Sequence, residues 1–190
     1  MTQTSRLDAF FDAARRVAAG CRDSADCVTA LVPLMERLVA APDGLFAGRD
    51  LKSDPDHYAR NLIALAPDGS LSLYALVWRP GQWTPVHDHG SWGVVGVVEG
   101  ALEERAYMSP DGTVRRDNGI HLLRGGVLLL RPGSVSSFVP NPDHIHVTGA
   151  PADRAGAVTL HLYGRTMSAF HVYDVDAGTR RLVDVPHQDS

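Results

Sequence analysis

The sequence predicts an all-β fold, an antiparallel sandwich or barrel, preceded by two helices. From residue 61 to residue 185 the chain consists of short apolar or alternating segments separated by glycine and proline, with no helical pattern between them. Turn sequences of the form Pro-Asp-Gly occur at residues 67–69 and 110–112. About eleven consecutive strands of this kind bury their apolar faces best in an antiparallel sandwich or barrel.

The length and composition indicate one globular domain. The chain has 190 residues, of which 44% are hydrophobic and 21% are charged, and this is enough to close a core without disulfides. Cys21 and Cys27 lie outside any CxxC spacing, so they predict buried thiols in a reducing compartment. We expect residues 1–190 to form a single domain, with a helical packing segment at 1–45 and a β-barrel at 58–185.

The charge pattern favours small-molecule partners. The net charge is −4 and the arginines are scattered, so the sequence offers no basic surface for a nucleic acid or an anionic membrane. The first residues lack the pattern of a signal peptide, and no stretch approaches 18 apolar residues. We therefore expect a cytoplasmic protein. The sequence leaves the oligomeric state open.

Two amphipathic helices are predicted before the strands. The first has six apolar residues at helical spacing, namely Leu7, Phe10, Phe11, Ala14, Val17 and Ala18. Thr4 or Ser5 can cap this helix, and Gly20 can end it. The second apolar set extends from Val28 to Val39, and Pro33 within it should kink or divide the helix. We expect both helices to be packing elements.

The strands are predicted from alternation and from the turns between them. The expected segments are 61–65, 71–79, 94–100, 101–107, 121–124, 127–133, 136–140, 144–147, 157–164, 170–175 and 180–185.

Two histidines in the stretch from Gly81 to Gly100 predict a metal site. Residues two apart on a strand point the same way, so His87 and His89 would lie about 6 to 7 Å apart, close enough to share one ion, while Asp88 faces away. The spacing of the glycines and histidines reproduces the first sequence motif of the cupins. This resemblance implies a jelly-roll barrel with the metal inside.

The second half of the chain must supply the remaining ligand. His144 and His146 share one strand face, so spacing alone does not choose between them. His57, His121 and His187 lie outside the strongest patterns.

The segment 157–163 carries a row of polar side chains. Thr159, His161 and Tyr163 fall on one face, and apolar residues fall on the other. Such a row can satisfy its own hydrogen bonds, with the Thr159 hydroxyl orienting His161 and His161 orienting the Tyr163 phenol towards the pocket. The alternative is the solvated face of an edge strand.

The chain resembles the thiol dioxygenases, iron-dependent cupins that include cysteine dioxygenase and 3-mercaptopropionate dioxygenase. The resemblance covers residues 58–174 and rests on HYARNLI at 57–63, HDH at 87–89, IHV at 145–147 and TLHLYG at 159–164. In this family the third iron histidine precedes the polar triad by thirteen residues, which is the separation of His146 and Thr159. The resemblance implies Fe(II) bound by His87, His89 and His146, with catalytic roles for Thr159, His161 and Tyr163.

The resemblance also implies a reaction, the oxidation of L-cysteine by O2 to cysteine sulfinic acid. Three neutral imidazoles leave Fe(II) with its double charge and three open positions, which favours a thiolate substrate. Arg60, with Tyr58 beside it, matches the family motif that binds the substrate carboxylate, for which a guanidinium is suited. The alternative for Arg60 is an ordinary surface residue, with Arg165 the next candidate.

Several features differ from the family pattern and leave alternatives open. In the 3-mercaptopropionate enzymes the position of Arg60 is typically glutamine, and their carboxylate-binding arginine falls where this chain has Val172. The metal strand, however, resembles the 3-mercaptopropionate branch at least as much as the cysteine branch. Thr159 replaces the usual serine, and Gly93 stands where many cupins have a glutamate ligand and mammalian cysteine dioxygenases have a crosslinked cysteine. A dioxygenase for 3-mercaptopropionate or another small thiol, a cupin enzyme of other chemistry, and a non-catalytic metal-binding cupin remain alternatives.

Overall fold

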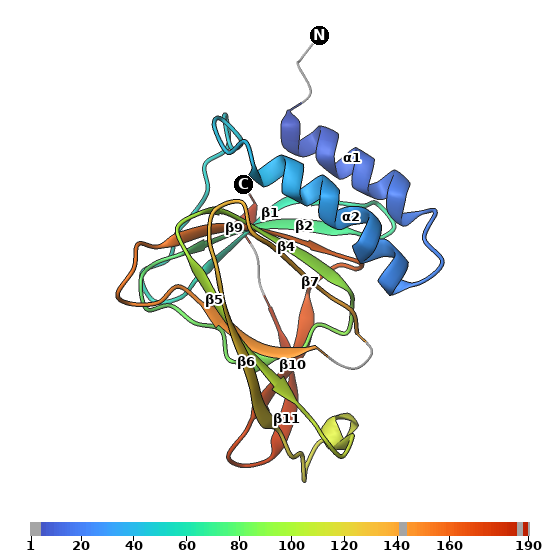
Figure 1. Ribbon diagram of the computed structural model, residues 1–190, viewed down its shortest axis with the longest axis vertical. Coiled ribbons are helices and arrows are strands. Elements are labelled where there is room, and N and C mark those ends of the chain that lie inside the picture. Colours follow the sequence, from blue (N-terminus) through green and yellow to red (C-terminus); the bar gives the residue numbers. More distant parts are fainter. Residues whose placement is uncertain (1–4, 141–143, 186–187, 190) are drawn as a thin grey trace.

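The protein consists of two facing six-stranded sheets, with two helices on the outer side of one of them (Figure 1). The computed structural model describes residues 5–140, 144–185 and 188–189. The helices are α1 (Arg6–Ala18) and α2 (Ser24–Val39), and both precede the strands. The predicted all-β class with two N-terminal helices is confirmed.

The first sheet has the strand order β12-β1-β2-β9-β4-β7. Its strands are β1 (Ala59–Leu65), β2 (Ser72–Trp78), β4 (Gly93–Glu99), β7 (Val135–Phe138), β9 (Ala157–Tyr163) and β12 (Gln188–Asp189). Neighbouring strands are antiparallel except for the β1–β12 pair, which is parallel.

The second sheet has the order β11-β10-β3-β8-β5-β6, and its neighbouring strands are antiparallel. Its strands are β3 (Val86–His87), β5 (Leu102–Met108), β6 (Leu123–Leu130), β8 (Ile145–Gly149), β10 (Ala169–Asp174) and β11 (Thr179–Asp184). A short 3-10 helix, η1 (Thr113–Arg115), connects β5 and β6 and was not predicted.

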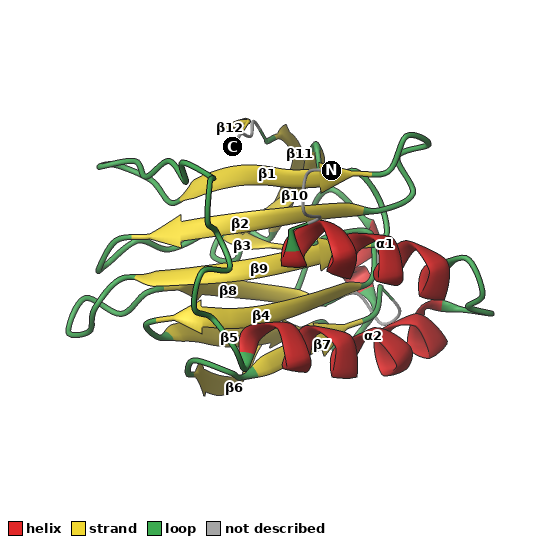
Figure 2. Cartoon of the chain, turned by 90° about the horizontal axis from the view of Figure 1, so that it is seen from above, coloured by secondary structure: helices red, strands yellow, loops and turns green. Residues whose placement is uncertain are grey.

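Both α-helices begin at side-chain caps and lie side by side across the first sheet (Figure 2). The Ser5 hydroxyl accepts the Asp8 N–H, and the Asp23 carboxylate accepts the Asp26 N–H, which satisfies an unpaired donor of each first turn. Thr4, the other predicted cap of α1, lies outside the described residues. Pro33 does not divide α2, which continues to Val39.

Packing explains why α2 remains one helix. Leu31 and Met35, on either side of Pro33, are fully buried in the core between the helices and the first sheet, and this burial offsets the backbone hydrogen bond that proline removes. The helix lies directly on β4, because a Cβ at Gly96 would come within 2.8 Å of Met35 Cγ and Val39 Cγ1. The helical segment is therefore fitted closely to the sheet that carries the polar row.

Strand β9 separates two cores. Its residues Leu160 and Leu162 face the helices, whereas Thr159, His161 and Tyr163 face the space between the sheets. Because β9 lies between β2 and β4 and these three polar side chains are buried, the alternative of a solvated edge strand is wrong.

Strand β6 differs from the prediction. The segments 121–124 and 127–133 were expected to be separate strands, but they form one strand that contains Gly125 and Gly126. The two glycines suggested a turn. They form a bulge in β6 instead: between the pairs Arg105–Val127 and Tyr107–Arg124, both glycines lie opposite the single residue Ala106, and the ladder continues on either side.

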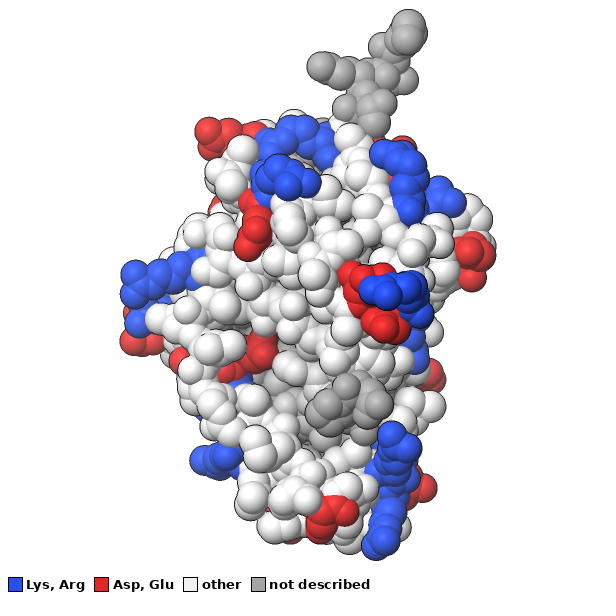
Figure 3. All heavy atoms as spheres, turned by 45° about the vertical axis from the view of Figure 1, so that its right-hand side comes forward, with Lys and Arg blue, Asp and Glu red and all other residues white. Residues whose placement is uncertain are grey.

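The surface carries both charges. On the face shown in Figure 3, Lys and Arg side chains alternate with Asp and Glu side chains in small groups separated by uncharged surface. Neither described α-helix has the length and hydropathy needed to span a membrane.

Candidate active site

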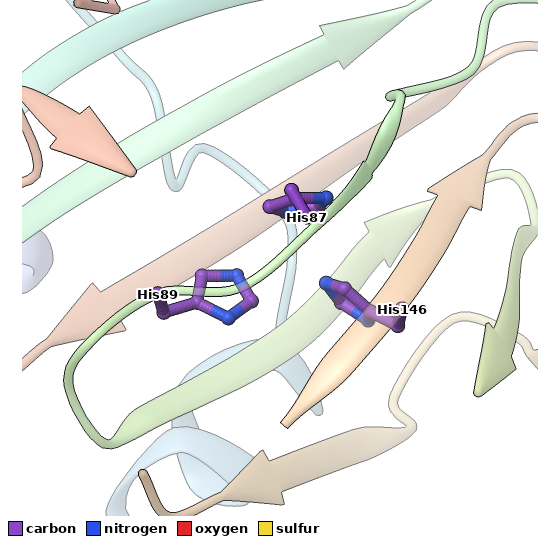
Figure 4. Close-up of side chains that lie close together, drawn as sticks. All are labelled: His87, His89 and His146. Atoms are coloured by element: carbon purple, nitrogen blue, oxygen red, sulfur yellow. The ribbon is translucent and has the colours of Figure 1, made fainter. Parts of the chain in front are cut away.

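Three buried histidines converge between the sheets (Figure 4). His87 ends β3, His146 is its partner on β8, and His89 follows in the loop after β3. The ring centroids are 4.8 Å apart for His87 and His89, 4.7 Å for His87 and His146, and 5.0 Å for His89 and His146. One nitrogen from each ring lies within 4.8 Å of the others. The prediction that His87 and His89 share a strand is wrong, because β3 ends at His87 and His89 lies in the following loop.

The hydrogen-bond partners of these rings leave nitrogen lone pairs available. His87 Nδ1 donates to the Pro85 carbonyl over 3.0 Å, so its Nε2 carries the lone pair. Among the described residues, neither His89 Nδ1 nor His146 Nε2 has a hydrogen-bond partner, although both atoms are buried. Buried nitrogens of this kind are costly unless they bind something. A metal ion fits this arrangement, since imidazole is a good ligand for iron, zinc and copper.

Burial also keeps the three rings uncharged. Desolvation lowers the pKa of His87 and His89 well below the ordinary histidine value, and the neighbouring imidazoles lower it further. Desolvation lowers the pKa of His146 as well. At neutral pH all three rings are therefore neutral, which is the form that binds metals.

Asp88 turns away from the histidines towards β10. One carboxylate oxygen accepts the backbone N–H of His171 over 3.0 Å, and the other accepts the Tyr173 hydroxyl over 2.8 Å and faces His171 Nδ1 at 3.1 Å. This network ties the segment between His87 and His89 to the neighbouring strand. The sequence indicated the direction of Asp88 but not these partners.

The polar row of β9 is hydrogen-bonded from end to end, and Trp78 extends it. The Trp78 indole N–H donates to the Thr159 hydroxyl oxygen over 2.9 Å, Thr159 Oγ1 lies 2.9 Å from His161 Nε2, and His161 Nδ1 lies 3.1 Å from the Tyr163 hydroxyl oxygen. Sequence reasoning missed Trp78, whose indole lies on the neighbouring strand β2.

The Trp78 indole N–H can only donate, so the Thr159 oxygen accepts this bond. A hydroxyl oxygen has a second lone pair as well as its proton, so the bonds from Thr159 to His161 and on to Tyr163 run in the direction set by which ring nitrogen of neutral His161 carries the proton. Burial supports the neutral ring, since it lowers the pKa of His161 to about 3. Burial also raises the pKa of Tyr163, which therefore keeps its phenolic proton. With the proton of His161 on Nδ1, the Tyr163 oxygen accepts it and the phenolic proton remains to be donated to another group.

The histidines and the polar row line one small cavity. It is about 20 Å³, room for about one water molecule. The lining residues are Tyr58, Arg60, Leu76, Trp78, Thr84, His87, His89, His146, Thr148, His161, Tyr163, Met167 and Phe170. Every predicted site residue except Thr159 is in this lining, and Thr159 lies directly behind His161.

Arg60 is a buried cavity residue, so the alternative of an ordinary surface arginine is wrong. It is 8% exposed. Its guanidinium donates to the Met167 carbonyl over 2.7 Å and to the Val185 carbonyl over 3.0 Å, and it lies 4.7 Å above the Tyr74 ring. These contacts hold the cation at the cavity wall, which also includes Tyr58, stacked on Trp78.

Arg165 is engaged elsewhere. It donates from Nη2 to the Ala169 carbonyl over 2.6 Å and from Nε to the Thr166 carbonyl over 3.2 Å, and it is not part of the cavity lining. Val172 pairs with His87 across β10 and β3, so the position that carries arginine in the 3-mercaptopropionate enzymes is close to the site but apolar in this chain.

His144 and His146 occupy different environments. The His144 ring stacks on Phe138 with a centroid distance of 4.5 Å, and it lies 6.0 Å from His89. Glu104 on the neighbouring strand β5 faces both histidines. Its carboxylate is 3.4 Å from His144 Nε2 and 3.5 Å from His146 Nδ1. His57 and His121 are exposed, and His187 lies outside the described residues.

Glu104 was missed by the sequence analysis, although a signal was present. In the strand 102–108, Leu102 and Glu104 share a face, and Leu102 is apolar. A carboxylate at an inward position of an alternating strand requires a buried partner.

Gly93 explains one departure from the family pattern. A Cβ at this position would lie 2.3 Å from Phe138 Cζ, so no side chain fits beside that ring. Phe138 instead stacks on His89 with a centroid distance of 4.3 Å. An aromatic ring on β7 thus lies where glutamate or cysteine of related proteins would project.

The facing sheets and the inward-pointing histidines define a cupin. The family described as cysteine dioxygenase type I matches residues 34–176, more than half of the chain. The chain belongs to this family, so the resemblance to the thiol dioxygenases is confirmed.

Individual relatives agree with the family. Cysteine dioxygenase type 1 from Bos taurus and that from Homo sapiens are each 26% identical to this chain over 133 residues, covering 70% of this chain and 63% of the relative. The chain thus matches less than two thirds of the length of these relatives.

Solved structures are more distant. A cupin-like protein from Thermotoga maritima has a TM-score of 0.42 at 17% identity, covering 70% of this chain and 84% of that protein. A double-stranded β-helix protein from Klebsiella pneumoniae has a TM-score of 0.44 at 12% identity, covering 71% of this chain and 91% of that protein.

Proposed function

We propose that this protein is a non-haem Fe(II) thiol dioxygenase that oxidises L-cysteine with O2 to cysteine sulfinic acid. The observation that carries the proposal is the meeting of two groups in one cavity: three neutral imidazoles, and a polar row that ends at the Tyr163 phenol. Membership of the cysteine dioxygenase type I family supports the reaction class.

His87, His89 and His146 would hold the iron. When bound, Fe(II) would supply a redox-active centre that activates O2 towards a thiolate. The buried nitrogens without partners and the neutral state of the rings support this ligand set. Imidazole binds several metals, so the choice of iron rests on the family.

Tyr163 is the proposed catalytic residue nearest the substrate sulfur. In the proposed tautomer the proton of His161 is on Nδ1 and is donated to the Tyr163 oxygen, so the phenolic proton can bond to an oxygen atom or to the substrate in the cavity. Thr159 and Trp78 are positioning residues, because they act through His161. The reaction converts a thiolate and O2 into a sulfinate, with both oxygen atoms in the product.

Arg60 and Tyr58 are the proposed substrate-binding residues. A buried guanidinium can pair with the carboxylate of a small thiol acid. The presence of arginine at 60 and valine at 172 favours L-cysteine over 3-mercaptopropionate. Oxidation of 3-mercaptopropionate or another small thiol is the alternative.

Oxygen uptake by the iron-loaded protein tests the proposal. We expect one O2 consumed per sulfinate formed, with L-cysteine a better substrate than 3-mercaptopropionate and cysteamine. Faster oxidation of 3-mercaptopropionate would change the substrate assignment but not the iron site. Stoichiometric metal binding with no thiol-dependent O2 uptake would favour a non-catalytic cupin.

A further inference from the structure

Glu104 is a buried acid placed directly behind a proposed metal ligand. It lies on β5, where Glu104 pairs with Thr148 and Ala106 pairs with His146 of β8, so its side chain sits diagonally beside His146 on the inner face. The carboxylate is 3.5 Å from His146 Nδ1, while His146 Nε2 is buried and has no partner among the described residues.

His146 Nδ1 faces two possible acceptors. It lies 3.3 Å from His144 Nε2 and 3.5 Å from the Glu104 carboxylate, which is itself 3.4 Å from His144 Nε2. The carboxylate is the stronger acceptor, because hydrogen bonds to a charged oxygen are stronger than those to a neutral nitrogen. A metal held at Nε2 would leave the proton of neutral His146 on Nδ1, on the side of Glu104.

We propose that Glu104 is a positioning residue of the metal centre, which accepts the Nδ1 proton of His146 and holds the Nε2 lone pair towards the ion. The inference rests on the proposed function, because it takes His146 as a ligand. His87 is fixed in the same way by the Pro85 carbonyl. The acceptor of His146 differs in carrying a negative charge, which makes the imidazole a stronger donor to the metal.

Metal affinity measures this role directly. Loss of a carboxylate that supports a metal-bound histidine typically weakens metal binding about 10- to 100-fold. We expect Glu104→Gln, which keeps an acceptor but loses the charge, to raise the Kd for Co(II) about tenfold or more. Glu104→Met, which loses both, should raise it further. The titration uses the visible absorption of Co(II) added to the full-length metal-free protein, so it requires no turnover.

Glu103→Gln is the matched control. Glu103 is the neighbouring residue of β5, and its carboxylate pairs with Arg105 instead of the histidines. Replacing the Glu103 carboxylate by an amide should leave the Kd for Co(II) unchanged. In the NMR spectrum of the Co(II) protein, the exchangeable ring proton of His146 should exchange faster with water in Glu104→Met than in wild type and Glu103→Gln, an effect that a purely structural role would not produce.

The outcomes separate this inference from the proposed function. Wild-type protein that binds no Co(II) through the three histidines would overturn both. If wild-type protein binds one Co(II), and the Kd of Glu104→Gln is within about threefold of the wild-type Kd, only the role of Glu104 is overturned. If Glu104→Gln does not fold by circular dichroism, Glu104→Asp replaces it. This variant keeps the charge but withdraws it from His146, and an unchanged Kd would again overturn the role.

Discussion

His146 of β8 and His144, which directly precedes that strand, provide the sharpest test of the ligand set. Only His146 faces His87 and His89, whereas His144 stacks on Phe138. We expect His146→Ala to lose stoichiometric iron and all turnover, and His144→Ala to keep the iron. Metal content by elemental analysis decides this. Full iron in His146→Ala, with loss in His144→Ala, would reverse the assignment.

Tyr163 ends the polar row and should act in turnover and not in folding. Tyr163→Phe removes only the hydroxyl group, so the iron content and the thermal transition should stay close to those of the wild type. Because a group that positions or donates a proton typically contributes about 10²- to 10⁴-fold, kcat should fall within that range. A loss smaller than about threefold would assign the phenol to packing.

Arg60 can be tested by comparing two substrates. Removing one partner of a buried charge pair typically costs about 2 to 5 kcal/mol, so Arg60→Ala should raise the KM for L-cysteine at least about 30-fold. Cysteamine lacks the carboxylate, and its KM should change little.

Arg60→Ala also loses the hydrogen bonds to the Met167 and Val185 carbonyls, which could disturb the cavity for any substrate. Such a disturbance would change the KM for L-cysteine and for cysteamine alike, so the ratio of the two KM values is unaffected by it. If both substrates are affected equally, Arg60 has a structural role, and the carboxylate is bound elsewhere.

At the scale of elements, the pairing of β4 with β7 depends on the absence of a side chain at Gly93, which lies opposite Phe138 in register. Gly93→Ala should lower the free energy of unfolding by about 1 to 3 kcal/mol, the usual cost of overpacking. In a Phe138→Leu background the added methyl group has more room, so the cost should be smaller. Denaturant unfolding of the four proteins gives the coupling energy, and additive effects would contradict a clash between these residues.

Alternation predicted the strands well where polar and apolar residues alternate regularly along the sequence. The inward row of β9 could be predicted because Thr159, His161 and Tyr163 alternate with apolar residues. Glu104 and Trp78 could not be assigned roles, because their partners come from strands far away in sequence. The inward direction of His89 was predicted, but its place in a loop was not, because a strand of two residues leaves no periodic signal that marks its end.

At the scale of the whole molecule, buried neutral histidines link stability to pH. Folding lowers the pKa of His87, His89, His146 and His161. Below about pH 6.5 the unfolded chain takes up protons that the folded chain does not, so stability is complete above that pH and is lost as the pH falls. Each such histidine contributes at most about 1.4 kcal/mol per pH unit to the slope.

His161 isolates one of these contributions without touching a proposed ligand. The pKa of His161 is about 3 in the folded protein, so its share of the loss extends from about pH 6.5 to about pH 3. In metal-free His161→Gln, the slope of unfolding free energy against pH between 6 and 4 should be smaller than in wild type by about 1.4 kcal/mol per unit. Equal slopes would mean that His161 is protonated in the folded protein.

The glycine that leaves room for Phe138, Gly93, also affects the covalent uniformity of the protein. Residue 93 has no side chain that could be joined to Tyr163, so no covalent bond between these two residues can divide the polypeptide into two species. Intact mass spectrometry of the purified protein should therefore show no fraction whose mass is lowered by the loss of two hydrogens at this position.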